Sequence, residues 1–520
     1  MRIYKIEMNI YNKSINVEEA TMAKKNKRIL WRRVEFYLML LYALLTLGFV
    51  IQFFTVKIIP IKINMAVIII LALLFLGLYF LQFGRKVNKI NRTLGKVLIV
   101  LLSVFLAIGN WYLFKTGSAF SRMTGEDTQT SVISVIVMKE SKAQSINDLK
   151  NSKFGLTETG NQDIMEKGLK DIKKDVEQDI STVSYKSYKN IAEDLYNGNI
   201  DAIIIDEATR SLFEENHKNF DNETRIIKSY KYKTSTKDIS KNVDVTSDSF
   251  NVYITGIDTY GGISTVSRSD VNMIATINPK THQILLTSIP RDYYIPQPCQ
   301  NNQKDKLTHT GIFGVECTIE TVENYFDIDI NYYLRVNFSS VVNIVDSLGG
   351  IQINNPVAFD ASDGSYSYPA GDISLDGAQA LRFVRERYNL ADGDRDRGKN
   401  QMRVISGIIN KAISPSIITN YTSILDAVSG SFQTNMSNSE MASIIKMQIN
   451  EMSGWDIEQL AVNGSGNASA WSPANGFNSW VMEPNVETVK RAVEVIKKVE
   501  KGEDVKELVK KVSAENTANE

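Results

Sequence analysis

Three uninterrupted apolar segments near the start of this 520-residue chain constrain its fold more than any other feature. None of them contains a charged residue, and they lie at residues 36–56, 63–84 and 97–114. Each is close to the roughly 20 residues that a helix needs to cross a hydrocarbon core. A buried core helix can have a similar composition, but three such segments in succession, each flanked by Lys or Arg, favour transmembrane helices. We therefore predict a three-helix membrane region over residues 36–114.

Basic residues next to these segments predict their orientation. Lys and Arg gather at the end of residues 1–35 and fill the loop between the second and third segments, which has no acidic residue. By the positive-inside rule both stretches are cytoplasmic, and the turn at 57–62 is outside. We expect a multi-pass protein of the cell membrane, with a cytoplasmic N-terminus and everything from Lys115 onward on the extracellular face. No signal-peptide cleavage site is evident, and Met22 is an alternative start to Met1.

Composition and location exclude several classes of function. Lys plus Arg total 59 and Asp plus Glu also total 59, so the chain has no overall attraction to nucleic acid, and none is expected as a partner. The sequence contains no P-loop, HExxH or GxSxG motif, which sets aside the common nucleotide, zinc-protease and serine-hydrolase signatures. Because no ATP is available outside a cell, a transfer reaction there must use a substrate that was activated beforehand.

The chain has only two cysteines, Cys299 and Cys317, which are separated by a polar loop. In an oxidising compartment they could form a disulfide. Spacing alone shows no geometry, so a disulfide and two free thiols remain equal alternatives. With so few cysteines and only three histidines, a thiolate or imidazole zinc site is not expected.

The part of the chain after the apolar segments divides into two predicted α/β units. A polar junction at 115–130 leads to alternating strand and helix patterns at 131–228, which predict a small accessory domain. This domain loosely resembles one lobe of an extracytoplasmic solute-binding domain, and a structural spacer is an equal alternative. A turn-rich linker at 229–249 precedes a larger α/β unit at 250–484. Residues 485–520 are predicted to be an amphipathic helix followed by a disordered tail.

One segment of the larger unit concentrates arginine. The stretch LRFVRERYNLADGDRDRGKNQ, residues 381–401, carries Arg385 and Arg387 two positions apart and more guanidinium groups beyond them. Arginine presents a planar fork that matches phosphate oxygens bidentately, and it keeps its charge when partly desolvated. The segment therefore suggests a polyanion site, and a solvated, salt-bridged surface loop is the alternative.

Further charged residues stand at predicted strand ends, where ligands bind in an open α/β sheet. Asp258 and Arg291 each follow an apolar strand, and Arg268 and Asp270 lie at the start of another. Two carboxylates facing several arginines predict a divalent cation held by Asp258 and Asp270, with Mg²⁺ preferred and Mn²⁺ as the alternative. The arginines would neutralise the remaining phosphate charge. Ordinary surface ion pairs could produce the same composition.

Four motifs connect these charges to a known family. DVNMIATINPKTHQILLTSIPRD, DSLGGI, LDGAQALRFVRER and GDRDRGKNQ together resemble the LytR-CpsA-Psr family, and the layout of three spans plus an accessory domain is similar to its capsule-associated CpsA branch. The resemblance implies an α-β-α sandwich with a mixed central sheet. It also implies a phosphotransferase on the outer face of Gram-positive membranes, which moves a glycopolymer from undecaprenyl diphosphate to a peptidoglycan hydroxyl.

The family's functional residues transfer to this chain position by position. The implied catalytic residues are Asp258, Asp270, Arg291 and Asp394, with Asp258 and Asp270 also associated with the metal. The implied diphosphate-binding set is Arg268, Arg291, Lys306, Arg385, Arg387, Arg397 and Gln401.

The leading hypothesis is a Mg²⁺-dependent ligase that attaches capsular polysaccharide to peptidoglycan. Its partners would be the polyprenyl-diphosphate-linked polysaccharide, peptidoglycan, membrane lipid and other capsule-assembly proteins. Two apolar stretches, 339–350 and 404–413, are candidates for the walls of a polyprenyl tunnel, although ordinary core helices explain them equally well. A cell-envelope sensor that acts through the accessory domain and a lipid-diphosphate hydrolase are the alternative functions.

Overall fold

The structure is a computed structural model that describes residues 34–55, 61–84, 86–123, 128–237, 239–257, 262–414 and 430–518. The chain divides into two compact units, Met1–Ser118 and Ala119–Glu520.

Within its described residues, the first unit contains three helices that are long and apolar enough to cross a membrane. They are α2 (Val34–Thr55), α3 (Ile61–Phe83) and α4 (Lys89–Met123). Apolar side chains of all three form one cluster that includes Tyr42, Leu78 and Ile99. A polar contact also joins two of the helices, because Asn110 Nδ2 of α4 donates to the Leu45 carbonyl of α2 over 3.0 Å. Such interhelical hydrogen bonds stabilise helix pairs in an apolar environment.

Helix α4 is longer than the sequence predicted. The third apolar segment was expected at 97–114 and a polar junction at 115–130, but the helix begins at Lys89 and ends at Met123. No proline interrupts the polar residues on either side of the apolar core, so nothing stops the helix there. The basic residues before Val34 lie outside the described residues, as do residues 57–60 of the outer turn predicted at 57–62. The last two residues of that predicted turn, Ile61 and Lys62, instead begin α3.

The second unit begins with an accessory domain, residues 128–235, built on a five-stranded sheet with the order β3-β2-β4-β1-β5. Its strands are β1 (Thr128–Met138), β2 (Lys153–Thr157), β3 (Ser181–Tyr185), β4 (Ala202–Asp206) and β5 (Thr224–Ser235). β2 runs parallel to β3 and β4, whereas β1 runs antiparallel to β4 and β5. Its helices are α5 (Gln162–Val176), α6 (Tyr188–Tyr196), α7 (Arg210–Glu214) and α8 (Phe220–Glu223), with 3₁₀ turns η1 (Ile146–Leu149) and η2 (Glu207–Thr209).

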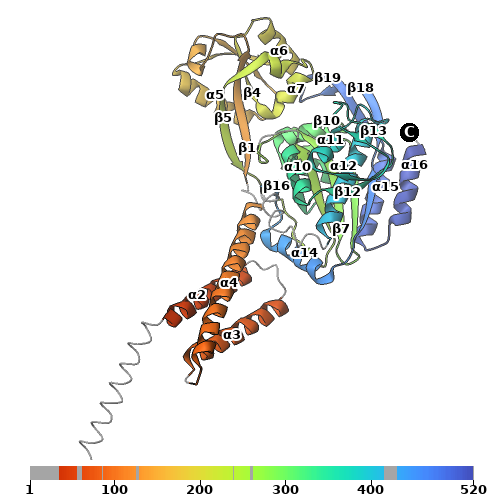
Figure 1. Ribbon diagram of the computed structural model, residues 1–520. Helices are drawn as coiled ribbons and strands as arrows, with labels where there is room; N and C mark the ends of the chain where they lie inside the picture. The colour runs from red at the N-terminus through yellow and green to blue at the C-terminus, as the bar shows by residue number, and fades with distance from the viewer. Residues whose placement is uncertain are drawn as a thin grey trace, which may run out of the picture. The chain divides into compact units, whose positions relative to one another are not determined.

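Helices cover both faces of this sheet (Figure 1). α5 packs on one face, and α6 and α7 pack on the other. Successive residues of a strand point to opposite faces. In β4, accordingly, Ile203 joins the apolar cluster with α6, and Ile204 joins the cluster with α5.

The predicted linker at 229–249 begins too early. β5 continues to Ser235 and pairs with β1 along its whole length. Tyr230 and Tyr232 alternate with lysines and pack toward α5, where their hydroxyls donate to Asp175 and Asp171 over 2.7 Å. This period-two alternation is the strand signal that the polar composition concealed.

The rest of the second unit is a sandwich domain, residues 250–518. It is built around a six-stranded mixed sheet with the order β16-β11-β6-β7-β8-β17. The strands are β6 (Phe250–Ile257), β7 (Ser269–Asn278), β8 (Gln283–Ser288), β11 (Tyr332–Asn337), β16 (Phe432–Thr434) and β17 (Asp456–Ala461). β11 is parallel to β6 and β17 is parallel to β8, whereas β7 is antiparallel to both β6 and β8. The predicted mixed central sheet is therefore present.

Two layers of helices enclose the sheet. In β7, Ile274 packs with α9 and α15 on one side, and Met273 and Ala275 pack with α12 on the other. The helices that lie within the described residues are α9 (Val315–Phe326), α10 (Phe338–Ser347), α11 (Gly377–Arg385), α12 (Asp394–Ala412), α14 (Asn438–Glu451), α15 (Val486–Glu500) and α16 (Lys506–Ala518). The fold is the α-β-α sandwich that the family resemblance implied.

Among the described residues, the sandwich domain also contains four antiparallel strand pairs. They are β9 (Tyr294–Gln297) with β10 (Gln303–Lys306), β12 (Ile351–Asn355) with β15 (Gly371–Leu375), β13 (Phe359–Asp360) with β14 (Ser367–Tyr368), and β18 (Gly464–Ser472) with β19 (Phe477–Pro484). Two 3₁₀ segments accompany them, η3 (Pro298–Gln300) and η4 (Leu307–Phe313).

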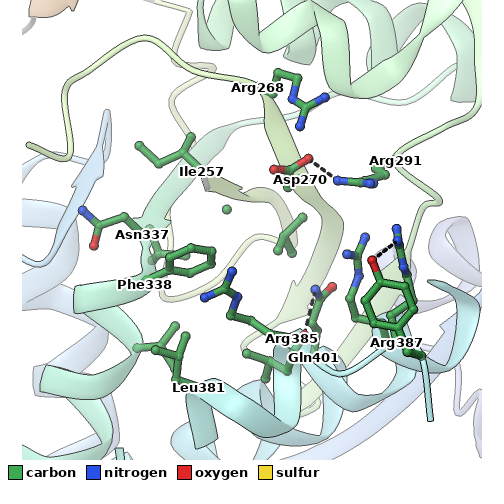
Figure 2. A pocket seen from close by; sticks show the side chains of 17 residues that line it. Ile257, Arg268, Asp270, Arg291, Asn337, Phe338, Leu381, Arg385, Arg387 and Gln401 are labelled. Atoms are coloured by element: carbon green, nitrogen blue, oxygen red, sulfur yellow. Dashed lines mark hydrogen bonds and ion pairs between the residues drawn. The ribbon is translucent and has the colours of Figure 1, made fainter. Parts of the chain in front are cut away.

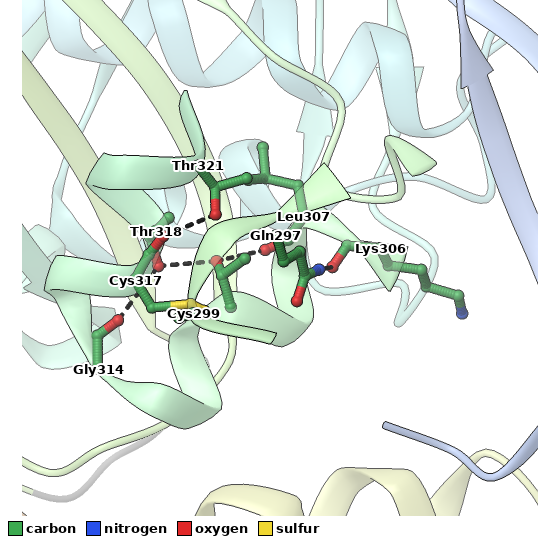
Figure 3. The surroundings of a disulfide bond; sticks show 9 residues. Gln297, Cys299, Lys306, Leu307, Gly314, Cys317, Thr318 and Thr321 are labelled. Carbon is green, nitrogen blue, oxygen red and sulfur yellow. Dashed lines mark hydrogen bonds between the residues drawn. A yellow bond between two sulfur atoms is a disulfide. The ribbon is translucent and has the colours of Figure 1, made fainter. Parts of the chain in front are cut away.

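A disulfide answers the question that the cysteine spacing left open. Cys299 of η3 is bonded to Cys317 in the first turn of α9, with a Cα–Cα distance of 5.6 Å (Figure 3). The same corner carries Lys306, whose carbonyl accepts a 2.9 Å hydrogen bond from Gln297 Nε2. The bridge therefore ties the β9–β10 loop to the helix layer.

The C-terminal prediction was wrong in one respect. Residues 485–520 were expected to be an appended helix with a disordered tail, but α16 continues to Ala518. Val505, Val509 and Val512 recur at helical spacing and are buried in the same core as α15. This apolar stripe, which composition alone obscured, makes α16 part of the sandwich.

Candidate active site

Six of the nine charged residues selected from the sequence meet at one edge of the six-stranded sheet, around a cavity of about 300 Å³ (Figure 2). Because β7 is antiparallel to its neighbours, its first residues lie beside the last residues of β6 and β8. This arrangement brings Asp270 of β7 near Arg291, which follows β8, and near Ile257 at the end of β6. Asn337 at the end of β11 completes this edge.

The lining of the cavity is strongly cationic. Within the described residues, its charged lining consists of one aspartate and five arginines, namely Asp270, Arg268, Arg291, Arg385, Arg387 and Arg397. Gln401 of α12 also lines it. The structure thus brings together residues from four separated segments of the chain, and the net positive charge favours an anionic ligand.

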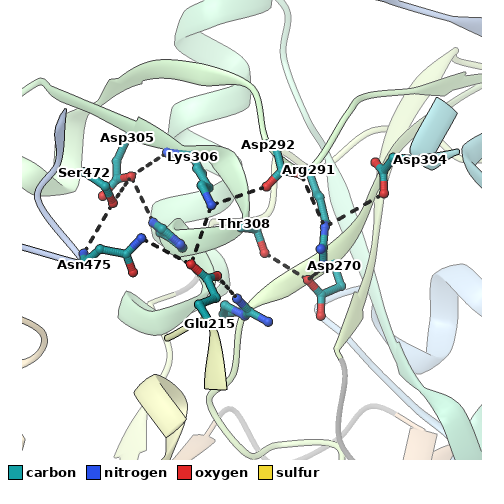
Figure 4. Close-up of polar contacts among 12 residues, drawn as sticks. Glu215, Asp270, Arg291, Asp292, Asp305, Lys306, Thr308, Asp394, Ser472 and Asn475 are labelled. Carbon is teal, nitrogen blue, oxygen red and sulfur yellow. Dashed lines mark hydrogen bonds and ion pairs between the residues drawn. The ribbon is translucent and has the colours of Figure 1, made fainter. Parts of the chain in front are cut away.

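Asp270 and Arg291 form an ion pair in the wall of this cavity. Arg291 Nη1 donates to Asp270 Oδ1 over 2.7 Å, and the two side chains are 19% and 13% exposed. Thr308 Oγ1 donates to the same carboxylate oxygen over 3.1 Å (Figure 4). Burial alone would raise the pKa of Asp270, but the guanidinium groups of Arg268, Arg291 and Arg397 hold that pKa well below its usual range. Asp270 is therefore ionised.

Arg291 also faces two further acids. Its Nε lies 3.6 Å from Asp292 Oδ2 and 4.0 Å from Asp394 Oδ1. Burial would lower the pKa of Arg291, but the surrounding carboxylates raise it above its ordinary value. Asp394, at the start of α12, is also ion-paired with Arg397 one helical turn later. The predicted catalytic residue Asp394 thus lies next to the cavity and orients two of its arginines.

A buried glutamate fixes the loop that carries Arg385 and Arg387. Glu386 lies between them. Its carboxylate accepts hydrogen bonds from the backbone N–H groups of Arg387 and Asn389, each over 3.0 Å. Burial would raise the pKa of Glu386, but these donors lower it, so the carboxylate stays ionised. The guanidinium of Arg385 lies over the Phe338 ring, 4.0 Å from its centroid. The arginine pair therefore has a fixed backbone and one stacked side chain.

Apolar side chains also line the cavity. These side chains are Ile257, Val271, Val336, Phe338, Val341, Leu381 and Val384. The predicted tunnel wall at 339–350 contributes Val341 of α10. None of the described residues in the other predicted wall, 404–413, lines this cavity, and α11 supplies Leu381 and Val384 instead. Residues 404–413 do not line the cavity because the C-terminal part of α12 leads away from the site toward β12.

The cavity lining that the described residues form includes neither Asp258 nor Lys306. Asp258 lies outside the described residues. The buried Nζ of Lys306 instead lies 4.0 Å from Asp292 Oδ1 and 3.8 Å from Glu215 Oε2 of the accessory domain.

The described residues offer limited support for a metal. Among them, no three His, Cys, Asp or Glu side chains form a group that could hold a metal ion. Asp270 Oδ2, however, is buried and has no hydrogen-bond partner within this part of the chain. One carboxylate oxygen therefore fits the role of a cation ligand, as Mg²⁺ often takes one or two carboxylates and completes its shell with phosphate oxygens and water.

Sequence reasoning missed several parts of this site. Glu215 belongs to the accessory domain, where no functional residue was nominated, and only the folded chain brings it to Arg268. The apolar residues Leu381 and Val384 belong to the same motif as the arginines: Leu381 precedes Arg382, and Val384 precedes Arg385. Their helical spacing, three residues apart and opposite the buried Phe383, was the signal that could have found them.

Comparison with known proteins agrees with this geometry. The model of the LytR_cpsA_psr family matches residues 211–494, which is more than half of the chain. The chain belongs to this family. A second model, of the DNA polymerase processivity factor, matches residues 88–205. That match begins next to the apolar helix α4 and covers less than a quarter of the chain, so it assigns no function here.

Two curated relatives share one name. The polyisoprenyl-teichoic acid–peptidoglycan teichoic acid transferase TagU of Enterococcus faecalis is 41% identical over 197 residues, which are 38% of this chain and 64% of that protein. The TagU of Bacillus subtilis is 37% identical over 212 residues, 41% of this chain and 67% of that protein. This chain therefore spans about two thirds of the length of these relatives.

Solved structures include the crystal structure of B. subtilis TagT, which is 28% identical and has a TM-score of 0.39 over 50% of this chain and 94% of that chain. A structure of TagT bound to LIIa-WTA is also 28% identical and has a TM-score of 0.41. The match covers 50% of this chain and 94% of that chain.

Proposed function

We propose that the chain is a membrane-anchored transferase that moves a glycopolymer from a polyprenyl diphosphate carrier to peptidoglycan. One observation carries this proposal: arginines and apolar side chains line the same cavity. Arginine forks match the oxygens of a diphosphate, and an apolar wall suits the first units of a polyprenyl chain. Few other activated donors have both a diphosphate and a long apolar chain.

The names of the relatives support both substrates, since each is called a polyisoprenyl-teichoic acid–peptidoglycan transferase. For the polymer we propose capsular polysaccharide, because three apolar helices and an accessory domain resemble the capsule-associated branch of the family. For the carrier we propose undecaprenyl diphosphate. Teichoic acid, the polymer named for the relatives, is the competing donor in the experiment below.

The proposed reaction is one phosphoryl transfer. The acceptor hydroxyl attacks the phosphorus that bears the polymer, a new P–O bond forms, and the bond to the bridging oxygen breaks. Polyprenyl phosphate leaves, and one phosphate remains as the linkage. Arg385 and Arg387 bind the phosphates, while Arg291 and Arg397 stabilise the charge that builds up on the bridging oxygen.

The proton of the acceptor hydroxyl needs a base. Asp270 is a weak base because its pKa is well below the usual range. Asp394, beside the cavity, is the candidate we propose among the described residues. A divalent cation at Asp270 Oδ2, Mg²⁺ or Mn²⁺, would neutralise further phosphate charge when bound.

We also propose that the accessory and sandwich domains face the outside of the cell. Lys86, Lys89, Arg92 and Lys96 lie between α3 and the apolar part of α4 without an acidic residue, which favours a cytoplasmic loop. The disulfide between Cys299 and Cys317 suits an oxidising compartment. Protease added to intact cells should remove the second unit; protection of that unit would refute the orientation.

A reconstituted reaction tests the proposed activity. The detergent-solubilised full chain is mixed with peptidoglycan, MgCl₂ and a labelled polyprenyl-diphosphate-linked oligosaccharide of capsular or teichoic acid type. We expect covalently attached label with the capsular donor and release of polyprenyl phosphate. Free sugar phosphate without attachment would identify a hydrolase instead, and no reaction with either donor would leave the sensor hypothesis. Attachment of the teichoic acid donor alone would keep the activity and correct the polymer.

A further inference from the structure

A carboxylate from the accessory domain reaches the cations of the active site. Glu215 follows helix α7 directly, and its Oε1 accepts a 2.8 Å hydrogen bond from Arg268 Nη1. Its Oε2 lies 3.8 Å from Lys306 Nζ (Figure 4). Arg268 lines the cavity, so this contact connects the accessory domain with the proposed diphosphate site.

Buried polar groups hold this carboxylate in place. Asn475 Nδ2, on the turn between β18 and β19, donates to Glu215 Oε2 over 3.3 Å, and the Asn475 side chain is fully buried. The backbone N–H of Asn475 donates to Ser472 Oγ, which in turn donates to Asp305 Oδ1 over 2.8 Å. Glu215 is therefore part of a network that three segments share, unlike a solvated surface pair.

Apolar packing fixes the accessory domain to the same segments. Val266, Ile312 and Ala474 of the sandwich domain are at most 9% exposed and join the apolar cluster of the accessory domain with Leu212 and Phe213. Val266 lies two residues before Arg268, and Ala474 directly precedes Asn475. The core of the accessory domain thus extends onto the loops that carry the partners of Glu215.

The charge of Glu215 is maintained by its surroundings. Burial would raise the pKa of its carboxyl, but Lys306, His309 and Arg268 lower that pKa below its ordinary value. An ionised carboxylate can orient a guanidinium through one nitrogen and leave its other donors for a ligand, because the arginine fork carries five N–H groups. The Arg268 side chain is only 12% exposed, so few other orientations are available to it.

We propose that Glu215 is a positioning residue, which holds Arg268 toward the diphosphate, and that the accessory domain thereby completes the active site. This inference rests on the proposed transferase function. It replaces the spacer interpretation of the accessory domain with a defined role. Without the carboxylate, Arg268 and Lys306 would lose their common anchor, and the donor would bind less tightly while the reacting groups around Arg291 stayed in place.

The experiment compares three variants of the full chain in detergent. Glu215→Gln removes the charge, Glu215→Asp keeps it on a shorter side chain, and Glu207→Gln is the matched control. Glu207 forms an equally close pair with Arg210, with Oε2 2.6 Å from Nε, but entirely inside the accessory domain. The readouts are KM and kcat for the lipid-linked donor and the Kd for farnesyl diphosphate, measured by calorimetry.

For Glu215→Gln we expect KM and Kd to rise about tenfold, because a tenfold loss of affinity corresponds to the free energy of about one charge-assisted hydrogen bond. We expect kcat to change less than about threefold. Glu215→Asp should recover part of this loss, and Glu207→Gln should leave both constants unchanged. The positioning role would be overturned if KM were unchanged in Glu215→Gln, or if that variant bound farnesyl diphosphate more tightly than wild type. It would also be overturned if Glu207→Gln raised KM and Kd as much as Glu215→Gln. A wild-type chain that transfers nothing would refute the proposed function itself, which separates the two failures.

Discussion

Replacing Asp270 with Asn perturbs the charge balance of the cavity with almost no change in shape. The carboxylate makes a 2.7 Å contact with Arg291 Nη1, and both side chains are largely buried. Removing one partner of a buried ion pair lowers stability by about 3–5 kcal/mol. Arg291 keeps Asp292 and Asp394 within 4.0 Å of its Nε, so we expect the lower end, about 3 kcal/mol.

The same substitution should change the response to acid. The pKa of Asp270 is lower in the folded protein than in the unfolded chain, where it is about 3.9. The unfolded state therefore takes up the proton first as the pH falls, so this stabilisation is fully present above about pH 4 and is lost below it. Asp270→Asn lacks this contribution at every pH, and its stability should depend less on acid.

Urea-induced unfolding of the detergent-solubilised protein, followed by tryptophan fluorescence between pH 3 and 7, measures both effects. Asp392→Asn is the matched control, because Asp392 pairs with Arg395 over the same 2.7 Å but is 32% exposed. Partly exposed pairs contribute at most about 1 kcal/mol. Equal stability of Asp270→Asn and wild type at pH 7, or an unchanged acid dependence, would refute the assignment of Asp270 as the buried counter-charge.

Three further changes have defined outcomes. Arg385→Ala with Arg387→Ala should lower transfer at least about 100-fold in the reconstituted assay with unchanged circular dichroism, because two phosphate-binding forks are lost; retained activity would count against the site. Cys299→Ser with Cys317→Ser should lower the free energy of unfolding by about 3 kcal/mol, as expected for a bridge across a sequence separation of 18, and an unchanged urea midpoint would contradict this. Burial raises the pKa of Asp206 to about 7, so the native state holds a proton there that the unfolded chain releases, and stability falls as pH rises toward 7. Asp206→Asn should therefore be more stable than wild type at pH 8, and lower stability of this variant in thermal unfolding at that pH would disprove the interpretation.

The sequence was informative where one physical signal dominated. Long uncharged segments identified the three apolar helices, and the strand-end positions of Asp270 and Arg291 predicted that they would meet. Parallel and antiparallel pairing at one sheet edge makes such a meeting independent of loop detail. Arg385 and Arg387 joined them because the motif that carries them ends a helix at the same edge.

The remaining features depended on contacts that no local pattern specifies. Glu215 is one acid among many on an amphipathic surface until the accessory domain packs against the loop of Arg268. The strand β5 was hidden by its lysines, and α16 was hidden by its polar tail. In each case tertiary packing determined the structure of the segment, whereas its composition reflected only the side chains that face solvent.

The most direct test of the central claim is a structure of the full chain in detergent with undecaprenyl diphosphate. We predict that the two phosphates lie among Arg268, Arg385, Arg387 and Arg397, and that the first isoprene units lie against Leu381. A head group bound elsewhere, or an empty cavity at saturating lipid, would contradict the account.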